Sequence, residues 1–201
     1  YALAAFTRKS AFSTEAGLKY FILGAFASGI LLFGMSLIYG LTGTTNYEDL
    51  AKILIGAYAS DVTIPNGLVI GMVFIIVALL FKATAAPFHM WAPDVYEGSP
   101  TSVTLFFTMV PKIAALSVFI RFLYVPFLNL IDQCQMIIVF LSIASMIFGA
   151  VAAIGQTNIK RLIAYSSIGH IGYTLAGLAT ASNEGIQSSI IYITIYVIMN
   201  L

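Results

Sequence analysis

The sequence predicts an all-α membrane protein, built as a polytopic transmembrane helical bundle with one helix broken at a proline. Hydrophobic residues make up 60% of the 201 residues and charged residues only 8%, whereas charged residues are about a quarter of a typical soluble domain. Apolar runs long enough to cross a bilayer recur along the chain. Because backbone polar groups in lipid need partners within their own segment, each spanning run is expected to be a helix.

The apolar runs define the order of the predicted spans. The first run follows Ser13, Thr14 and Glu15, residue types that typically begin a helix. Residues 1–6 look like the end of an earlier span, and the chain stops inside an apolar run. We therefore expect residues 1–201 to be a single transmembrane domain, the central part of a longer subunit. Its spans, about six in all, are expected at about 17–41, 67–92, 101–125, 134–156, 161–181 and 186–201.

The longest connection, about 42–66, is polar and is predicted to be exposed, with a short interfacial helix from Glu48 to Tyr58. Loop charge predicts the orientation of the spans. Alternating spans place most basic residues on one side, which the positive-inside rule assigns to the cytoplasm or the mitochondrial matrix. That side is predicted to hold Arg8, Lys9, Lys19, Lys160 and Arg161, and the other side Lys52 and Arg121.

Lys112 interrupts an apolar run close to its middle, with about eleven residues on either side. This places it ~16 Å deep in a hydrocarbon core of ~30 Å. A lysine at that depth costs about 2.5–3.5 kcal/mol, so an ionisable residue there indicates function. Burial disfavours the charged form of a lysine, and a nearby carboxylate would favour that form. A lysine balanced between these two effects can gain or lose its proton when its surroundings change, as a switchable proton site requires. Pro111 predicts a departure from ideal helix geometry beside it.

Lys82 lies in a second apolar run, five residues before Pro87. Proline removes a backbone donor, so the helix is expected to break between Ala83 and Pro87, with Thr84 helping to bond the freed groups. Broken helices within membranes recur at ion sites because they expose the ends of helix dipoles. Lys82 is thus a second candidate for proton transfer, and the alternative is a lysine that extends toward the interface.

Two histidines are further candidates for proton transfer. His170 lies about ten residues into its run, with Ser166, Ser167 and Tyr173 around it at helical spacing. Imidazole changes charge near neutral pH and can pass protons, although a lone buried histidine can also be a packing residue. His89, near the predicted break, is either a relay or a packing residue.

Lys19 is the last candidate, and it lies four residues after Glu15. The two side chains face each other on a helix, so Lys19 either forms an interfacial pair or begins a proton-uptake path. Asp94 and Glu97 flank a turn and are expected to cap it. Interfacial positions are predicted for the aromatic residues Trp91, Tyr96 and Tyr124. Close helix packing is predicted for Gly24, Gly29 and Gly34.

Composition also argues against several functions. The single cysteine, Cys134, permits no internal disulfide and no thiolate cluster. There is no cysteine cluster for iron–sulfur, no paired histidine arrangement for haem and no glycine-rich nucleotide loop. The chain is therefore predicted to bind no cofactor or metal itself. No Lys/Arg-rich tract is present, so nucleic acid is not an expected partner.

Three stretches resemble one family. Residues 81–101 read FKATAAPFHMWAPDVYEGSPT, residues 156–173 read QTNIKRLIAYSSIGHIGY and residues 13–20 read STEAGLKY. These strings resemble the antiporter-like subunit N family of respiratory complex I, called subunit 2 of NADH dehydrogenase in mitochondria. The likeness covers essentially the whole chain.

The resemblance implies an antiporter-like subunit of proton-translocating NADH:ubiquinone oxidoreductase, in which this chain performs no redox chemistry. It implies proton transfer by Lys82, on the broken helix, and by Lys112, His170 and Lys19. It also implies that Lys82 pairs with a glutamate whose expected position lies before Tyr1. NADH, FMN, iron–sulfur clusters and ubiquinone would be bound by other subunits. Partners would be other membrane-arm subunits, the lipid bilayer and protons.

The implied location is the mitochondrial inner membrane, with a bacterial plasma membrane as the alternative. Two rival functions share the expected fold. One is a stand-alone cation/proton antiporter subunit, which would transport Na⁺ without NADH. The other is a structural segment of complex I that does not pump.

Overall fold

A computed structural model describes residues 1–7, 10–59 and 65–200 of the chain. The described residues fold into α-helices joined by turns and one short 3-10 helix, so the all-α prediction is confirmed. In chain order the elements are α1 Ala11–Thr42, α2 Tyr47–Ala59, α3 Asn66–Ala83, α4 Ala92–Gly98, α5 Thr101–Tyr124, η1 Leu128–Leu130, α6 Ile131–Ile154, α7 Ile159–Leu178 and α8 Asn183–Met199.

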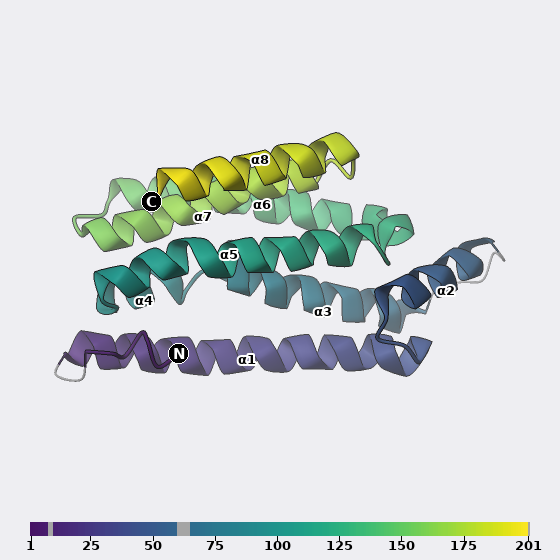
Figure 1. Cartoon of the computed structure of the whole chain (residues 1–201), viewed down its shortest axis with the longest axis horizontal. Helices are drawn as coiled ribbons and strands as arrows, with labels where there is room; N and C mark the ends of the chain where they lie inside the picture. The colour runs from purple at the N-terminus through teal and green to yellow at the C-terminus, as the bar shows by residue number, and fades with distance from the viewer. Residues whose placement is uncertain (8–9, 60–64, 201) are drawn as a thin grey trace.

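The long helices lie side by side and alternate in direction (Figure 1). α1, α5 and α7 run one way, and α3, α6 and α8 run the other. The short helix α4 lies at the end where α1 begins, and α2 lies at the opposite end. The alternation agrees with the predicted order of spans. α2 also confirms the predicted short helix, and it packs Leu50 and Leu54, one turn apart, into the core.

Four described helices are long and apolar enough to cross a membrane by length and composition. They are Ala11–Thr42, Asn66–Ala83, Thr101–Tyr124 and, within α6, Gln133–Ile154. α7, which carries several polar residues, and α8, with 17 residues, run alongside them. Four of the six predicted spans thus correspond to these helices, and the spans predicted at α7 and α8 stay a prediction.

α1 and α3 approach closely where two glycines face each other. A Cβ on Gly34 would lie 2.8 Å from the backbone oxygen of Gly71, and a Cβ on Gly71 would lie 3.0 Å from that of Gly34. Neither helix could come as near with a larger residue at this crossing. The packing prediction is confirmed for Gly34. It is wrong for Gly29, because a Cβ there would meet no atom of the described residues within 4 Å. Gly24 packs against the ring of Tyr1.

Gly34→Ala and Gly29→Ala are expected to have opposite effects on stability. Both positions lie in α1, and alanine improves the propensity of a helix interior by about 0.5–1 kcal/mol. At Gly34 the added methyl meets the Gly71 backbone, an overpacking that costs about 1–3 kcal/mol. Thermal unfolding in detergent should show a lower midpoint for Gly34→Ala and an equal or higher one for Gly29→Ala. Equal shifts for the two variants would contradict the glycine contact.

Candidate functional site

The predicted break in the second span is confirmed, because α3 ends at Ala83. The next residue, Thr84, has φ 67°, in the left-handed region, and its backbone N–H bonds back to the carbonyls of Leu80 and Phe81. The N–H of Ala85 also donates to the Leu80 carbonyl, at 3.0 Å. The chain then passes through turns to α4, which begins at Ala92.

The groups freed by the break are bonded by side chains distant in sequence. Thr84 helps to bond them through its backbone N–H, as predicted, whereas its side-chain hydroxyl is buried and has no hydrogen-bond partner among the described residues. Instead the hydroxyl of Ser145, on α6, accepts from the N–H of Ala86 at 2.9 Å. The indole of Trp91 donates to the Phe81 carbonyl at 3.0 Å. The broken segment is thus held in the bundle by Ser145 of α6 and by the indole of Trp91.

Lys82 lies in the last turn of α3, beside the break. Its Nζ donates to the hydroxyl of Tyr1 at 3.3 Å and lies 5.6 Å from the centre of that ring. Within the described residues no carboxylate forms an ion pair with it. The side chain is only partly buried, so the structure places this lysine at the border between the bundle and the N-terminal segment.

Lys112 is fully enclosed, with 0% of its surface exposed. It lies at the middle of α5, as predicted, and its Nζ has no hydrogen-bond partner among the described residues. Two tyrosine rings face the ammonium group. The ring centre of Tyr96, on α4, is 5.8 Å from Nζ, and that of Tyr196, on α8, is 5.6 Å away. Both distances fall within the range of a cation–π contact.

The predicted departure from helix geometry at Pro111 is wrong, because α5 runs continuously from Thr101 to Tyr124. Proline nevertheless supplies no N–H, so the carbonyl four residues earlier, that of Phe107, loses its helical partner. The hydroxyl of Tyr96 donates to this carbonyl at 3.0 Å. The proline therefore creates the acceptor that fixes the ring of Tyr96 beside Lys112.

His170 lies on α7, half-buried, beside the same cluster. Its Nδ1 is 2.9 Å from the hydroxyl of Tyr192, and its ring is 4.9 Å from that of Tyr196. The Tyr196 hydroxyl in turn shares a hydrogen bond of 2.7 Å with Ser167. The structure thus brings Lys112 and His170 together through Tyr196, a residue that sequence reasoning missed because it lies on another helix.

His89 lies in the turns after the break and is buried. Its ring centre is 4.3 Å from that of Phe148, on α6, and its Nδ1 has no hydrogen-bond partner among the described residues. These contacts are those of a packing residue, and they place His89 against α6.

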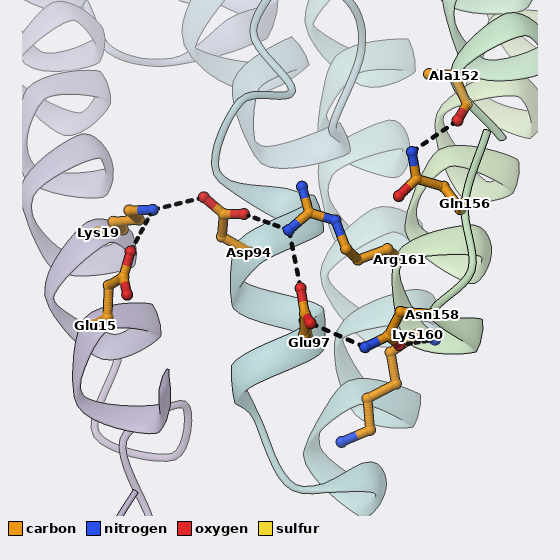
Figure 2. A network of polar contacts seen from close by, with 9 residues as sticks. All are labelled: Glu15, Lys19, Asp94, Glu97, Ala152, Gln156, Asn158, Lys160 and Arg161. Atoms are coloured by element: carbon orange, nitrogen blue, oxygen red, sulfur yellow. Dashed lines mark hydrogen bonds and ion pairs between the residues drawn. The ribbon is translucent and has the colours of Figure 1, made fainter. Parts of the chain in front are cut away.

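A network of charged residues joins α1, α4 and α7 (Figure 2). Lys19 donates to Glu15 and to Asp94, both at 2.7 Å, so the predicted pair on α1 extends to α4. Arg161, at the start of α7, bonds Asp94 at 3.0 Å and Glu97 at 2.8 Å. Asp94 therefore receives a cation from each side. The network fastens α4 to both neighbouring helices.

Two more residues extend this network: Asn158, just before α7, and Lys160, in its first turn. Asn158 donates to Glu97 at 2.9 Å, and Lys160 donates to the Ser99 carbonyl at 2.7 Å. The prediction that Asp94 and Glu97 only cap a turn is wrong: both belong to α4 and bind partners on other helices. Lys19, Lys160 and Arg161 lie near the starts of α1 and α7, whereas Lys52 lies in α2 and Arg121 near the end of α5. The starts of α1 and α7 are at one end of the bundle, and α2 and the end of α5 are at the other (Figure 1), which agrees with the predicted separation of the basic residues. Arg8 and Lys9 lie outside the described residues.

Two of the three aromatic residues predicted at the interface are enclosed within the bundle. Trp91 and Tyr96 are 1% and 0% exposed, and Trp91 stacks on Tyr20 with ring centres 4.7 Å apart. Each polar group reaches a backbone carbonyl, so burial costs little. Tyr124 is partly buried, with its hydroxyl bonded to the Leu178 carbonyl at 2.8 Å.

Among the described residues, no group of histidine, cysteine and acidic side chains is placed to hold a metal ion.

Among the described residues, an all-helical bundle with a broken helix, an enclosed lysine and a half-buried histidine beside it defines a polytopic membrane protein of the transporter type. The family model for the transmembrane segment of NADH:quinone oxidoreductase and Mrp antiporters matches residues 1–201. The chain belongs to this family.

Relatives and solved structures agree with the family. The NADH-quinone oxidoreductase subunit N of Pelagibacter ubique is 64% identical over 201 residues, all of this chain and 41% of that protein. The NADH-ubiquinone oxidoreductase chain 2 of Marchantia polymorpha is 56% identical, over all of this chain and 41% of that protein. The chain thus spans about two fifths of the relatives it matches.

A chain of respiratory complex I from Thermus thermophilus matches the structure with a TM-score of 0.79 and 36% identity. That match covers 100% of this chain and 41% of the other. A chain of the Mrp complex from Dietzia sp. matches with a TM-score of 0.84 and 27% identity, over 95% of this chain and 34% of the other.

Proposed function

We propose that this chain is a section of a membrane subunit of a proton-translocating NADH:quinone oxidoreductase, and that it carries protons through the bilayer. The redox reactions would take place in other subunits of the complex, which bind NADH, FMN, iron–sulfur clusters and quinone. Its own partners would be neighbouring membrane subunits and lipid. The relatives come from bacteria and from a plant, so the host membrane is a bacterial plasma membrane or a mitochondrial inner membrane.

One observation carries the proposal: Lys112 is fully enclosed at the middle of an apolar helix and has no carboxylate partner among the described residues. A charge there is costly, so a lysine is retained where its proton is used. Tyr196, Ser167 and His170 continue from it as groups that donate and accept hydrogen bonds. Such groups, together with water, provide a route for protons.

Lys82 and Lys19 have different places in this proposal. Lys82, beside the helix break, would respond to a change at the N-terminal side of the chain, where Tyr1 contacts it. Lys19 forms ion pairs with both Glu15 and Asp94. These pairs favour a role in joining α1 to α4 by charge over a role in carrying protons. His89, packed on Phe148, would support the break without being required for transfer.

The Mrp resemblance keeps a cation/proton antiporter as the second candidate. The identity of 64% to a subunit N, against 27% to the Mrp chain, favours the oxidoreductase. A structural segment without pumping is the third candidate, and the enclosed lysine argues against it because an apolar residue would be more stable at that position.

The test uses the full-length subunit in its assembled complex, reconstituted in vesicles, with Lys82→Met and Lys52→Met compared. Quinone reduction and vesicle acidification are followed together, with sodium and with sodium replaced by choline. We expect NADH-driven acidification without sodium, and its loss in Lys82→Met. Lys52, exposed on α2, is the control and should change neither rate. Sodium-dependent transport without NADH would favour the antiporter, and pumping unchanged by Lys82→Met would contradict the role of that lysine.

A further inference from the structure

The ammonium group of Lys112 lies between two aromatic rings from different helices. The rings belong to Tyr96 and Tyr196, at 5.8 and 5.6 Å, and both side chains are buried, at 0% and 5% exposure. The π face of a tyrosine attracts a cation, and the attraction is greatest where water is excluded. The two rings therefore offer the charged lysine a stabilising environment that contains no opposite charge.

Each ring is held in place through its hydroxyl group. Tyr96 donates to the Phe107 carbonyl, which Pro111 leaves without its helical partner, and Tyr196 shares a bond with Ser167 on α7. Neither hydroxyl bonds Nζ of Lys112, which has no hydrogen-bond partner among the described residues. The rings thus meet the ammonium through their faces, and the hydroxyls serve to position them.

The ring of Tyr96 is also connected to the charged network. Tyr96 lies in the seven-residue helix α4 with Asp94 and Glu97, which bind Lys19 and Arg161. Because Asp94, Tyr96 and Glu97 lie within one turn of the same short helix, a change in the network that moved α4 would also move the Tyr96 ring relative to Lys112. The ionisable groups that face Lys112 from the packed elements are the two tyrosines and, on α7, His170.

We propose that Tyr96 and Tyr196 are positioning residues for Lys112: they form an aromatic clamp that stabilises its charged form, and α4 transmits changes in the charged network to that clamp. The clamp rests on the proposed function, since it assigns to Lys112 the proton that is moved. It assigns a role beside Lys112 to two tyrosines that the sequence alone does not place near that lysine.

The experiment changes the electron density of one ring while keeping its shape. In the assembled complex, position 96 is replaced by phenylalanine and then by phenylalanines carrying one, two and three ring fluorines. Fluorine withdraws density from the π face, so pumping per quinone reduced should fall stepwise, by roughly 3- to 30-fold across the series. Tyr96→Phe keeps the ring but loses the hydroxyl bond to the Phe107 carbonyl, so it should pump somewhat less than wild type and serves as the reference for the fluorinated variants. The same series at Tyr124, whose hydroxyl also bonds a carbonyl, is the control and should give no trend.

A flat series at position 96, with all fluorinated variants equal to Tyr96→Phe, would overturn the clamp. A loss already complete in Tyr96→Phe would also overturn it, because the ring that remains in this variant would then contribute nothing to pumping. Lys112→Met in the same vesicles separates the two proposals. If it abolishes this subunit's pumping while the series is flat, the clamp fails and the proposed function stands.

Discussion

Replacing Lys112 by methionine should abolish proton transfer through this subunit while leaving the protein as stable as before, or more so. Methionine has similar length and no charge, and it fills the same enclosed space. Replacing a buried ionisable group by a well-packed apolar one is commonly neutral or stabilising. A group that takes and gives a proton, by contrast, contributes about 10²–10⁴-fold to the rate of the step it serves.

The measurement combines vesicle acidification, quinone reduction and thermal unfolding of the assembled complex. Lys52→Met, in the exposed pair with Asp49, provides the matched control and should leave all three unchanged. Stability that is kept or raised, with pumping lost, is the signature of a residue retained for function at a cost in stability. Full pumping in Lys112→Met would remove the main support for a proton path through α5.

Arg161→Glu should have the second largest effect, because it would place three carboxylates at one point of the bundle. Arg161 now bonds both Asp94 and Glu97, and about a third of its side chain is exposed. Solvent screens part of the repulsion, so the cost is expected to be about 1–3 kcal/mol, between the values for exposed and for buried pairs. α4 would lose its attachment to α7, and Tyr96 would lose its place beside Lys112.

The readouts are thermal unfolding and pumping of the assembled complex. Lys52→Glu reverses a cation that is 75% exposed on α2 and should shift stability by less than about 0.5 kcal/mol. The double variant Arg161→Glu with Glu97→Arg restores opposite charges between α4 and α7 and should recover part of the loss. If the double variant is as damaged as Arg161→Glu alone, the attachment of α4 does not depend on this ion pair.

The local features of the fold could be predicted from the sequence. The lengths of the apolar runs predict the helices, and Pro87 predicts the end of α3 within the few residues after Lys82. The central position of Lys112 in its run predicts its burial, because there is no near interface for its side chain to reach. These are properties of neighbouring residues in one segment.

The features that were missed depend on residues far apart in the chain. Lys19 and Asp94 are 75 positions apart, and Arg161 and Asp94 are 67 apart, so helix spacing gives no indication of either contact. Tyrosine commonly occurs at membrane interfaces, so the sequence predicts an interfacial position for Tyr96 and gives no sign that its ring is enclosed. Its burial depends on the carbonyl freed by Pro111, which only the packing of α4 on α5 brings within reach.

A double-mutant cycle tests most directly whether Lys112 and His170 lie on one proton path, as proposed. Protons translocated per quinone reduced are measured for Lys112→Met, His170→Gln and the double variant in the assembled complex. Residues that serve one path are not additive, so the double variant should lose no more than Lys112→Met alone. Independent losses that multiply in the double variant would place the two residues on separate routes and contradict the path through Tyr196.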